Sequence, residues 1–231
     1  AIVTRALLES FDLFQDKRIT KSKNKAIPDS DKESLTSIIT LYQCNKELLK
    51  LYRKNTHSGG NKSLKVYLKF RPSEDEISSF YNLAEGFWTS FTNKIDVISS
   101  YISSEDENPA TLFRNRENGG NLLFRPVGIL PFIQAAIEVN KRTDHTFDDI
   151  FTTFNRMNFL LNERPWKNVL WNPNEKTMIM GSGGVVKLLL IYMYNEGLIR
   201  PSERTKLIDK YADKIGYEGE DKESVLEEVP I

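Results

Sequence analysis

Few residues in this chain of 231 have side chains suited to catalysis. There is one cysteine, Cys44, and there are two histidines, His57 and His145. This set is too small for a zinc site built from cysteine and histidine, and it offers no Cys-His nucleophilic pair. The sequence also lacks a Gly-x-Ser-x-Gly elbow, a Walker A lysine motif and a Gly-x-Gly-x-x-Gly motif. We therefore expect no catalytic residue, no metal site and no cofactor.

Basic residues are concentrated where they could bind phosphate instead. The first 72 residues hold 15 Lys and Arg against 7 Asp and Glu, although the whole chain has 32 of each kind. The densest group lies in segment 16–31, which contains Pro28 and is expected to be a loop. Its members are Lys17, Arg18, Lys21, Lys23 and Lys25. Such a density attracts phosphate or another acidic partner, although it would equally suit a solvated loop.

Three arginines lie around a glycine turn in the middle of the chain. Arg114 and Arg116 precede Gly119-Gly120, and Arg125 follows it. Three guanidinium groups folded close together would suit phosphate contacts. Arg125 could instead pair with a carboxylate inside the domain, and the sequence does not decide between the two. These arginines and the five residues of the lysine-rich segment are the predicted nucleic-acid-binding residues.

A second glycine segment, Gly181-Ser182-Gly183-Gly184, precedes a very apolar run. The amides of Gly183 and Gly184 could bind an anion at the start of a helix, with Lys187 one turn further along. The alternative is that glycine is needed there for close packing between a strand and a buried helix. The last two predicted helices also have the proportions of a helix-turn-helix motif, which two consecutive helices often share by chance.

Hydrophobic spacing predicts a mainly α, multi-helix globular domain with one small β-hairpin. The hairpin is expected at 169–180, around the turn Asn172-Pro173-Asn174. Ser73 with Glu76 and Thr146 with Asp149 form patterns typical of helix amino termini. Helices are expected at 4–14, 34–52, 73–102, 128–140, 146–157, 185–196 and 202–215.

The strongest periodic signal runs from Ile77 to Ile102, where apolar residues alternate spacings of four and three. It predicts one continuous helix, about 40 Å long at 1.5 Å per residue. Such a helix could form a dimeric coiled coil or pack inside its own domain. Phe80, Phe87 and Tyr101 add apolar surface outside the seam, which favours the second alternative.

We expect the domain to span residues 1–217 and the acidic segment 218–231 to be a mobile tail. That segment holds six acidic residues and one lysine. The single cysteine fits a reducing compartment, and the sequence offers neither a signal peptide nor an apolar run long enough for a membrane span. These features predict a cytoplasmic protein without a membrane partner.

Two separated motifs carry a resemblance to a known family. Residues 118–128 read Asn-Gly-Gly-Asn-Leu-Leu-Phe-Arg-Pro-Val-Gly, and Arg164-Pro165-Trp166 and Val169-Leu170-Trp171-Asn172 follow about forty residues later. Together they resemble the carboxy-terminal region of the DGQHR-domain (DndB-like) family. The Asp-Gly-Gln-His-Arg signature itself occurs nowhere in the chain, so we expect either a fragment lacking the amino-terminal domain or a divergent relative.

The resemblance implies a DNA-associated, non-catalytic helical domain, with a role in regulating DNA phosphorothioate modification or transcription. DNA is then the expected partner. The alternative is a protein interaction scaffold that packs on a partner or on the missing amino-terminal domain. A third possibility is an enzyme whose site is completed by residues outside this sequence.

Overall fold

The computed structural model describes residues 1–22, 24–56, 66–69, 72–227 and 229. It confirms a mainly α, multi-helix globular domain with a small β-hairpin. The α-helices are α1 (Ile2–Ser10), α2 (Ile38–Thr56), α4 (Glu74–Lys94), α5 (Asp96–Ile102), α6 (Pro126–Arg142), α7 (Phe147–Phe154), α8 (Gly183–Tyr194) and α9 (Pro201–Ile215). The short 3-10 helices are η1 (Asp12–Phe14), η2 (Pro109–Leu112), η3 (Leu122–Phe124), η4 (Glu196–Leu198) and η5 (Lys222–Leu226). The strands are β1 (Ile19–Thr20), β2 (Thr36–Ser37), β3 (Trp171–Asn172) and β4 (Thr177–Met178).

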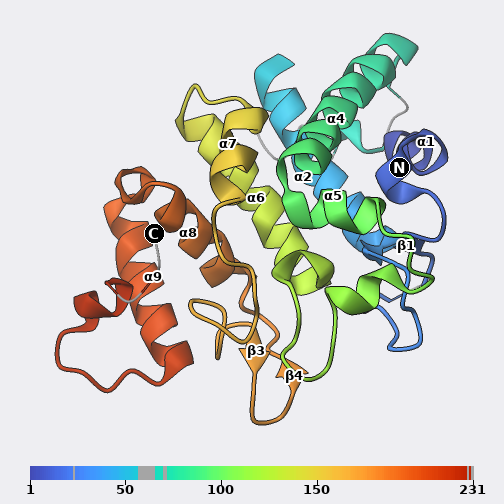
Figure 1. The fold of residues 1–231 in the computed structure, drawn as a ribbon. Coiled ribbons are helices and arrows are strands. Elements are labelled where there is room, and N and C mark those ends of the chain that lie inside the picture. Colours follow the sequence, from blue (N-terminus) through green and yellow to red (C-terminus); the bar gives the residue numbers. More distant parts are fainter. Residues whose placement is uncertain (23, 57–65, 70–71, 228, 230–231) are drawn as a thin grey trace.

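Helix α6 runs through the middle of the molecule (Figure 1). It packs against α2 on one side and α8 on another, and also contacts α7 and η3. Phe132 shows why this helix is central, because its ring contacts the rings of Phe91, Phe151, Phe154 and Phe159. Helix α8 is more apolar still, with eight of its 12 residues buried. A helix that is apolar on most sides is stable only when other elements enclose it.

The start of α6 differs slightly from its predicted position. The helix begins at Pro126, which occupies the first helical turn, where its lack of an amide is harmless. The predicted range 128–140 would have put Pro131 in the first turn, but with the helix starting at Pro126 it lies inside the helix.

The predicted continuous helix over 73–102 is wrong in one respect, because it is broken at Ile95. Helix α4 ends there in an extended residue with φ −104° and ψ 101°, and α5 begins at Asp96. The amide of Asp96 donates to Asn155 Oδ1 at 2.8 Å, so a side chain at the end of α7 accepts the hydrogen bond of an amide at the break. Phe80, Phe87 and Tyr101 are buried in the domain core, as expected for a helix that packs internally.

Both predicted amino-terminal caps are confirmed. Ser73 accepts a hydrogen bond from the amide of Glu76, whose carboxylate accepts one from the amide of Ser73. Thr146 and Asp149 form the same reciprocal arrangement at the start of α7. These patterns were readable because each involves groups only three residues apart.

The second helix does not begin at Ser34, where its predicted range 34–52 starts. Helix α2 starts at Ile38, and Ser37 Oγ accepts a hydrogen bond from the amide of Thr40 at 3.3 Å. Ser34 is buried, and its hydroxyl contacts the backbone oxygen of Lys17 and the carboxylate of Asp31, each at 2.8 Å. Thr36 and Ser37 form β2, which pairs in parallel with β1. Two-residue strands leave no alternating pattern, so nothing in the chain indicated this pair.

The predicted hairpin is confirmed, with Trp171 opposite Met178 in β3 and β4. It packs against the Gly119-Gly120 turn, so the two segments that carry the family resemblance lie together. A Cβ on Gly119 would lie 2.7 Å from the ring of Trp171, and the amide of Leu161 donates to Gly120 O at 2.9 Å. Gly119 also has φ +80°, which disfavours any side chain there.

Part of the acidic segment 218–231 contacts the domain. Helix η5 packs against α9, and Val225 and Leu226 are buried. The hydroxyl of Tyr217 contacts Ser224 Oγ at 2.6 Å. This segment therefore has apolar contacts that its acidic composition did not indicate, while its mobility stays a prediction. The Gly59-Gly60 pair predicts a loop at 56–62, which lies almost entirely outside the described residues.

No helix within the described part of the chain combines the length and the apolar character that crossing a membrane requires. Across the same residues, no three His, Cys, Asp or Glu side chains come together as a potential metal site.

We expect Phe132→Ala to lower the free energy of unfolding by about 3–5 kcal/mol, because it removes a buried ring and leaves a cavity. Chemical denaturation followed by circular dichroism measures the change. Leu112, whose side chain is 61% exposed, offers the control, and Leu112→Ala should alter stability by no more than about 0.5 kcal/mol. Equal losses in the two variants would contradict a core centred on α6.

Candidate anion-binding site

A cleft of about 310 Å³ opens beside the amino terminus of α8. Its walls come from α2, α6, the end of the hairpin and the loop between β1 and β2. The residues that line it are Lys25, Ala26, Ile27, Thr40, Gln43, Arg114, Arg125, Pro126, Val127, Leu130, Pro131, Gln134, Met178, Met180, Gly181, Ser182 and Gly183. Residues from all three predicted groups, the lysine-rich segment, the arginine turn and the glycine segment, thus meet at one place.

The charge of this lining is entirely positive. Lys25, Arg114 and Arg125 are basic, and none of the described lining residues is acidic. Because the cleft is partly enclosed by apolar groups, these charges are less screened by water than charges on an open surface. The cleft therefore favours an anionic ligand.

Arg125 is held by backbone oxygens and has no carboxylate partner among the described residues. Its Nε donates to Gly119 O at 2.9 Å, and its Nη2 donates to Asn115 O at 2.8 Å and Gly119 O at 2.7 Å. Burial lowers the pKa of Arg125 to about 10, and the positive charge of Arg114 acts in the same direction. The alternative, pairing with an internal carboxylate, is thus not made as an ion pair, and within the described structure Nη1 donates to no protein group.

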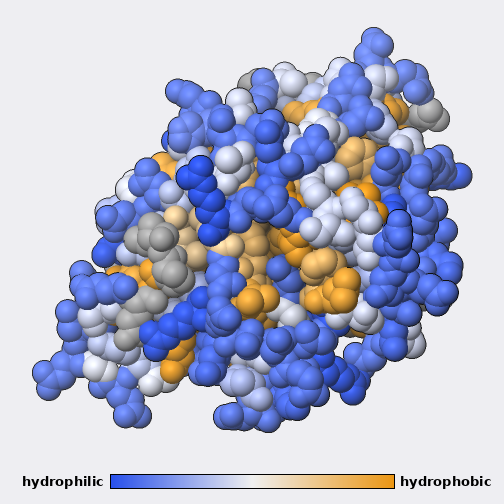
Figure 2. Space-filling view, viewed as in Figure 1, coloured by the Kyte–Doolittle hydropathy of each residue, from blue (hydrophilic) through white to orange (hydrophobic). Residues whose placement is uncertain are grey.

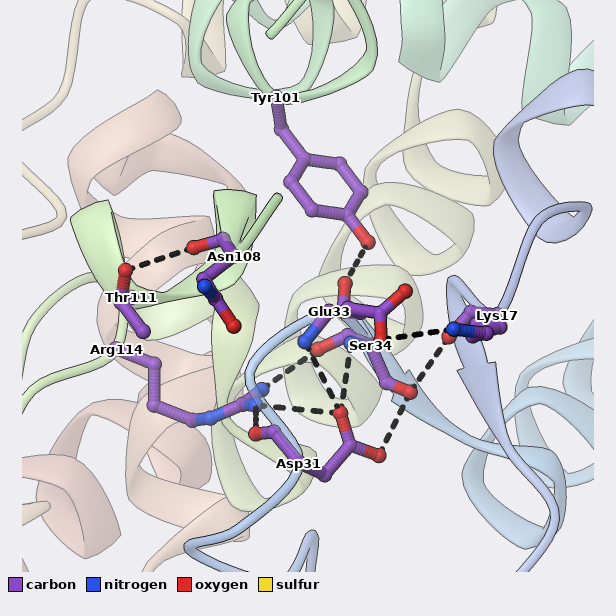
Figure 3. A network of polar contacts seen from close by, with 8 residues as sticks. All are labelled: Lys17, Asp31, Glu33, Ser34, Tyr101, Asn108, Thr111 and Arg114. Carbon is purple, nitrogen blue, oxygen red and sulfur yellow. Dashed lines mark hydrogen bonds and ion pairs between the residues drawn. The ribbon is translucent and has the colours of Figure 1, made fainter. Parts of the chain in front are cut away.

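Arg114 serves a different purpose, because it fastens the end of the lysine-rich loop to the domain (Figure 3). Its Nη1 donates to Ser34 O at 2.6 Å, and its Nη2 donates to Asp31 O. The side chain is only 8% exposed, and Asp31 Oδ1 lies 3.8 Å from Nη2. Burial lowers the pKa of Arg114, which the charge of Asp31 partly opposes.

Further hydrogen bonds hold the same segment, Asp31 to Ser34, in place. The hydroxyl of Tyr101 donates to Glu33 O, and burial raises the pKa of this tyrosine (Figure 3). Burial alone would raise the pKa of Asp31, but hydrogen bonds from the amide and hydroxyl of Ser34 lower it below its usual value. The segment from Asp31 to Ser34 is therefore fixed at both its backbone and its side chains.

The amino terminus of α8 contributes unpaired donors. Gly183, Gly184 and Val185 occupy the first turn, where amides have no acceptor within the helix. Ser182 precedes them and lines the cleft, but its conformation is helical, with φ −87° and ψ −1°, and it makes no side-chain cap. Its side chain is buried, and its Oγ has no hydrogen-bond partner.

Packing does not explain the two glycines at the start of α8. A Cβ on Gly183 or Gly184 would meet nothing within 4 Å. Only Gly181, with φ +79°, needs glycine for its backbone conformation. The close-packing explanation for Gly183 and Gly184 is therefore wrong.

The other predicted residues of the glycine segment lie outside the lining. Gly184 is exposed, and Lys187 lies one turn into α8 and is half-buried. Of the three predicted anion-binding residues, only Gly183 lines the cleft.

The remaining predicted nucleic-acid-binding residues differ in exposure. Arg18 is largely buried and donates to Asp12 O at 2.7 Å. Lys17 and Arg116 are exposed but lie beside carboxylates, Lys17 at 3.3 Å from Glu33 and Arg116 in contact with Asp29. Lys21 and Lys25 are exposed and belong to no ion pair of the described residues, and Lys23 lies outside those residues.

Sequence reasoning missed Ser182 and the apolar wall of the cleft. Ser182 stands within the glycine segment, and a serine directly before an apolar helix was the available signal. Leu130, Met178 and Met180 come from separate elements, so no spacing in the chain could have indicated that they share a cleft.

The chain matches no protein-family model, and neither curated proteins nor solved structures give a significant match. The class of protein that the structure itself defines is a multi-helix domain with a positively charged cleft.

We expect Arg114→Met to lower the free energy of unfolding by about 1.5–3 kcal/mol, because it leaves two buried backbone oxygens without their charged donor. Thermal and denaturant unfolding measure the loss. Arg116→Met is the matched control and should leave the unfolding midpoint unchanged, since Arg116 is 75% exposed. The structural role of Arg114 would be refuted if both variants unfolded at the wild-type midpoint.

Proposed function

We propose that this chain is a non-catalytic helical domain that binds DNA through the loop between β1 and β2. The observation that carries the proposal is an exposed lysine-rich loop whose end, from Asp31 to Ser34, is held to the domain by hydrogen bonds. Lysine side chains of such a loop neutralise phosphates and release counterions, which is the main source of affinity in sequence-independent DNA binding.

The geometry divides the predicted contacts into two groups. Lys21 and Lys25 are exposed and make no ion pair among the described residues, and Lys17, just before β1, is exposed but lies beside Glu33. Arg18 and Arg114 are engaged in internal hydrogen bonds. The arginines thus position the loop, and the lysines contact the phosphates. A loop fixed at Asp31 to Ser34 presents its charges with less loss of conformational entropy on binding than a free loop would.

The resemblance to the DGQHR-domain family supports DNA as the partner. It also suggests the narrower role, regulation of DNA phosphorothioate modification. The residues that carry the resemblance fold against one another, at Gly119 and Trp171, and they hold Arg125 beside the cleft.

We expect a short duplex with 5′-hydroxyl ends to bind in the micromolar range at low salt, and binding to weaken steeply as salt rises from about 50 to 200 mM. The double variant Lys17→Gln and Lys21→Gln should weaken binding and reduce the salt slope by about 2, since each lost phosphate contact removes about 0.9. Fluorescence anisotropy across a salt series measures both quantities.

The matched control removes the same charge elsewhere. Lys206→Gln with Lys210→Gln changes two exposed lysines of α9, and it should leave affinity and slope unchanged. A stronger effect from the α9 pair would instead favour the helix-turn-helix alternative. Binding that does not respond to salt, or no binding at low salt, would refute the proposal.

A protein interaction scaffold is a second candidate, supported by an apolar groove. The groove lies between α1, α2 and the start of α4. Ile2 and Leu68 line it and are 48% and 42% exposed. Elsewhere, on the face shown in Figure 2, hydrophilic residues predominate and hydrophobic residues show in smaller patches between them. Exposed apolar groups that gather at a groove are typical of contact surfaces.

If this groove mediates self-association, light scattering should give a mass above 26.7 kDa at high concentration. Leu68→Ser should shift the protein toward the monomer, because it removes apolar area from the contact. Leu112→Ser changes another exposed leucine, which does not line the groove, and serves as the control. A monomer at every concentration would leave self-association without support.

A further inference from the structure

The lining of the cleft beside α8 contains polar and apolar groups. The polar groups are the amino terminus of α8 with Ser182 and Gly183, and the basic side chains of Lys25 and Arg125. The apolar residues are Ile27, Pro126, Val127, Leu130, Pro131, Met178 and Met180. A ligand that contacts both kinds of group must combine an anionic group with an apolar body.

The polar groups of the lining have the features of a phosphate site. The first amides of a helix point outward and carry the positive end of the helix dipole, so they bind phosphate oxygens directly. The hydroxyl of Ser182 is buried without a partner, which is costly unless a ligand supplies one. The unused Nη1 of Arg125 is a third donor, and a guanidinium prefers a phosphate over a single-atom acceptor.

The charge balance favours a doubly charged group over a carboxylate. Three cationic residues line the cleft, and none of the described lining residues is acidic. Asp31, outside the lining, partly offsets the charge of Arg114 at 3.8 Å. Lys25 and Arg125 make no ion pair among the described residues, and Asp29 acts on Arg125 only through its charge. A phosphomonoester dianion would compensate this charge more fully than a monovalent anion.

The apolar residues of the lining suit a flat aromatic ring. Leu130, Met178 and Met180 come from α6 and the hairpin, and methionine adapts to the shape of an aromatic ring and makes favourable sulfur contacts with it. Met180 is 70% exposed, so a bound ring would cover apolar surface that now faces water. The volume of about 310 Å³ lies at the lower end of the range for small-molecule sites, roughly 300–1,000 Å³.

We infer that this cleft binds a phosphomonoester carrying an aromatic base, with the phosphate on Ser182, Gly183 and Arg125 and the base against Leu130 and Met178. Two sources share this chemistry, a free nucleoside monophosphate and the 5′-phosphate end of a DNA strand. The site shares Lys25 with the loop proposed to bind DNA. The groups that would hold the phosphate, Ser182, Gly183 and Arg125, lie outside that loop, so the inference does not rest on the DNA-binding proposal.

The test is isothermal titration calorimetry on the whole chain with adenosine 5′-monophosphate, adenosine and inorganic phosphate. We expect the monophosphate to bind, inorganic phosphate to bind more weakly and adenosine to bind least. Ser182→Ala should weaken the monophosphate about tenfold or more, the effect of losing a charge-assisted hydrogen bond. It should leave folding intact, because the hydroxyl has no partner to lose. Lys25→Glu, at an exposed position, should weaken it further by reversing a charge at the mouth of the cleft.

Ser202→Ala and Lys206→Glu on α9 make the same chemical changes at exposed positions outside the cleft and should bind as the wild type does. Competition identifies the source of the ligand. A single strand with a 5′-phosphate that displaces the monophosphate, when the same strand with a 5′-hydroxyl does not, indicates a strand end. If neither strand competes, the ligand is a free nucleotide. Equal binding of adenosine and its monophosphate, no binding of any probe, or wild-type affinity in Ser182→Ala would overturn the inference.

Discussion

The apolar surface of α6 is the constraint on which the rest of the structure depends. Helices α2, α7 and α8 and the short helix η3 surround it, and its side chains are buried on several sides. Each fully buried large apolar side chain contributes about 1.5–3 kcal/mol to folding relative to an exposed one. The positions of the elements that enclose this helix, including α2 and α8 at the cleft, follow from the need to bury it.

Enclosing α6 also brings arginines into the interior, and their partners decide the electrostatics. Arg114 and Arg125 are satisfied chiefly by backbone oxygens, whereas Arg142 on the far end of α6 pairs with Glu203 at 2.7 Å and with Glu138 at 2.8 Å. A carbonyl satisfies a hydrogen bond without neutralising charge, but a carboxylate does both. The end of α6 beside α8 therefore keeps a positive field, and the other end does not.

Local features were predictable from the sequence, and features that join distant segments were not. Both capping boxes follow from groups three residues apart, and the hairpin follows from its turn residues. The break at Ile95 depends on Asn155, and the role of Ser34 depends on Arg114, eighty residues away. Of the candidate site, the basic and glycine residues were identified as three separate groups, but not the fact that Lys25, Arg125 and Gly183 share one cleft.

The sequence by itself determined the helical class of this protein and the excess of positive charge in its first 72 residues, because both are properties of composition and short-range spacing. Only the tertiary structure decided which basic residues are free to bind a ligand. Arg18 and Arg114 donate hydrogen bonds to backbone oxygens of the domain, whereas Lys21 and Lys25 are exposed. The reason is physical: the availability of a charged group depends on the backbone oxygens and carboxylates that folding brings near it, and those come from distant parts of the chain.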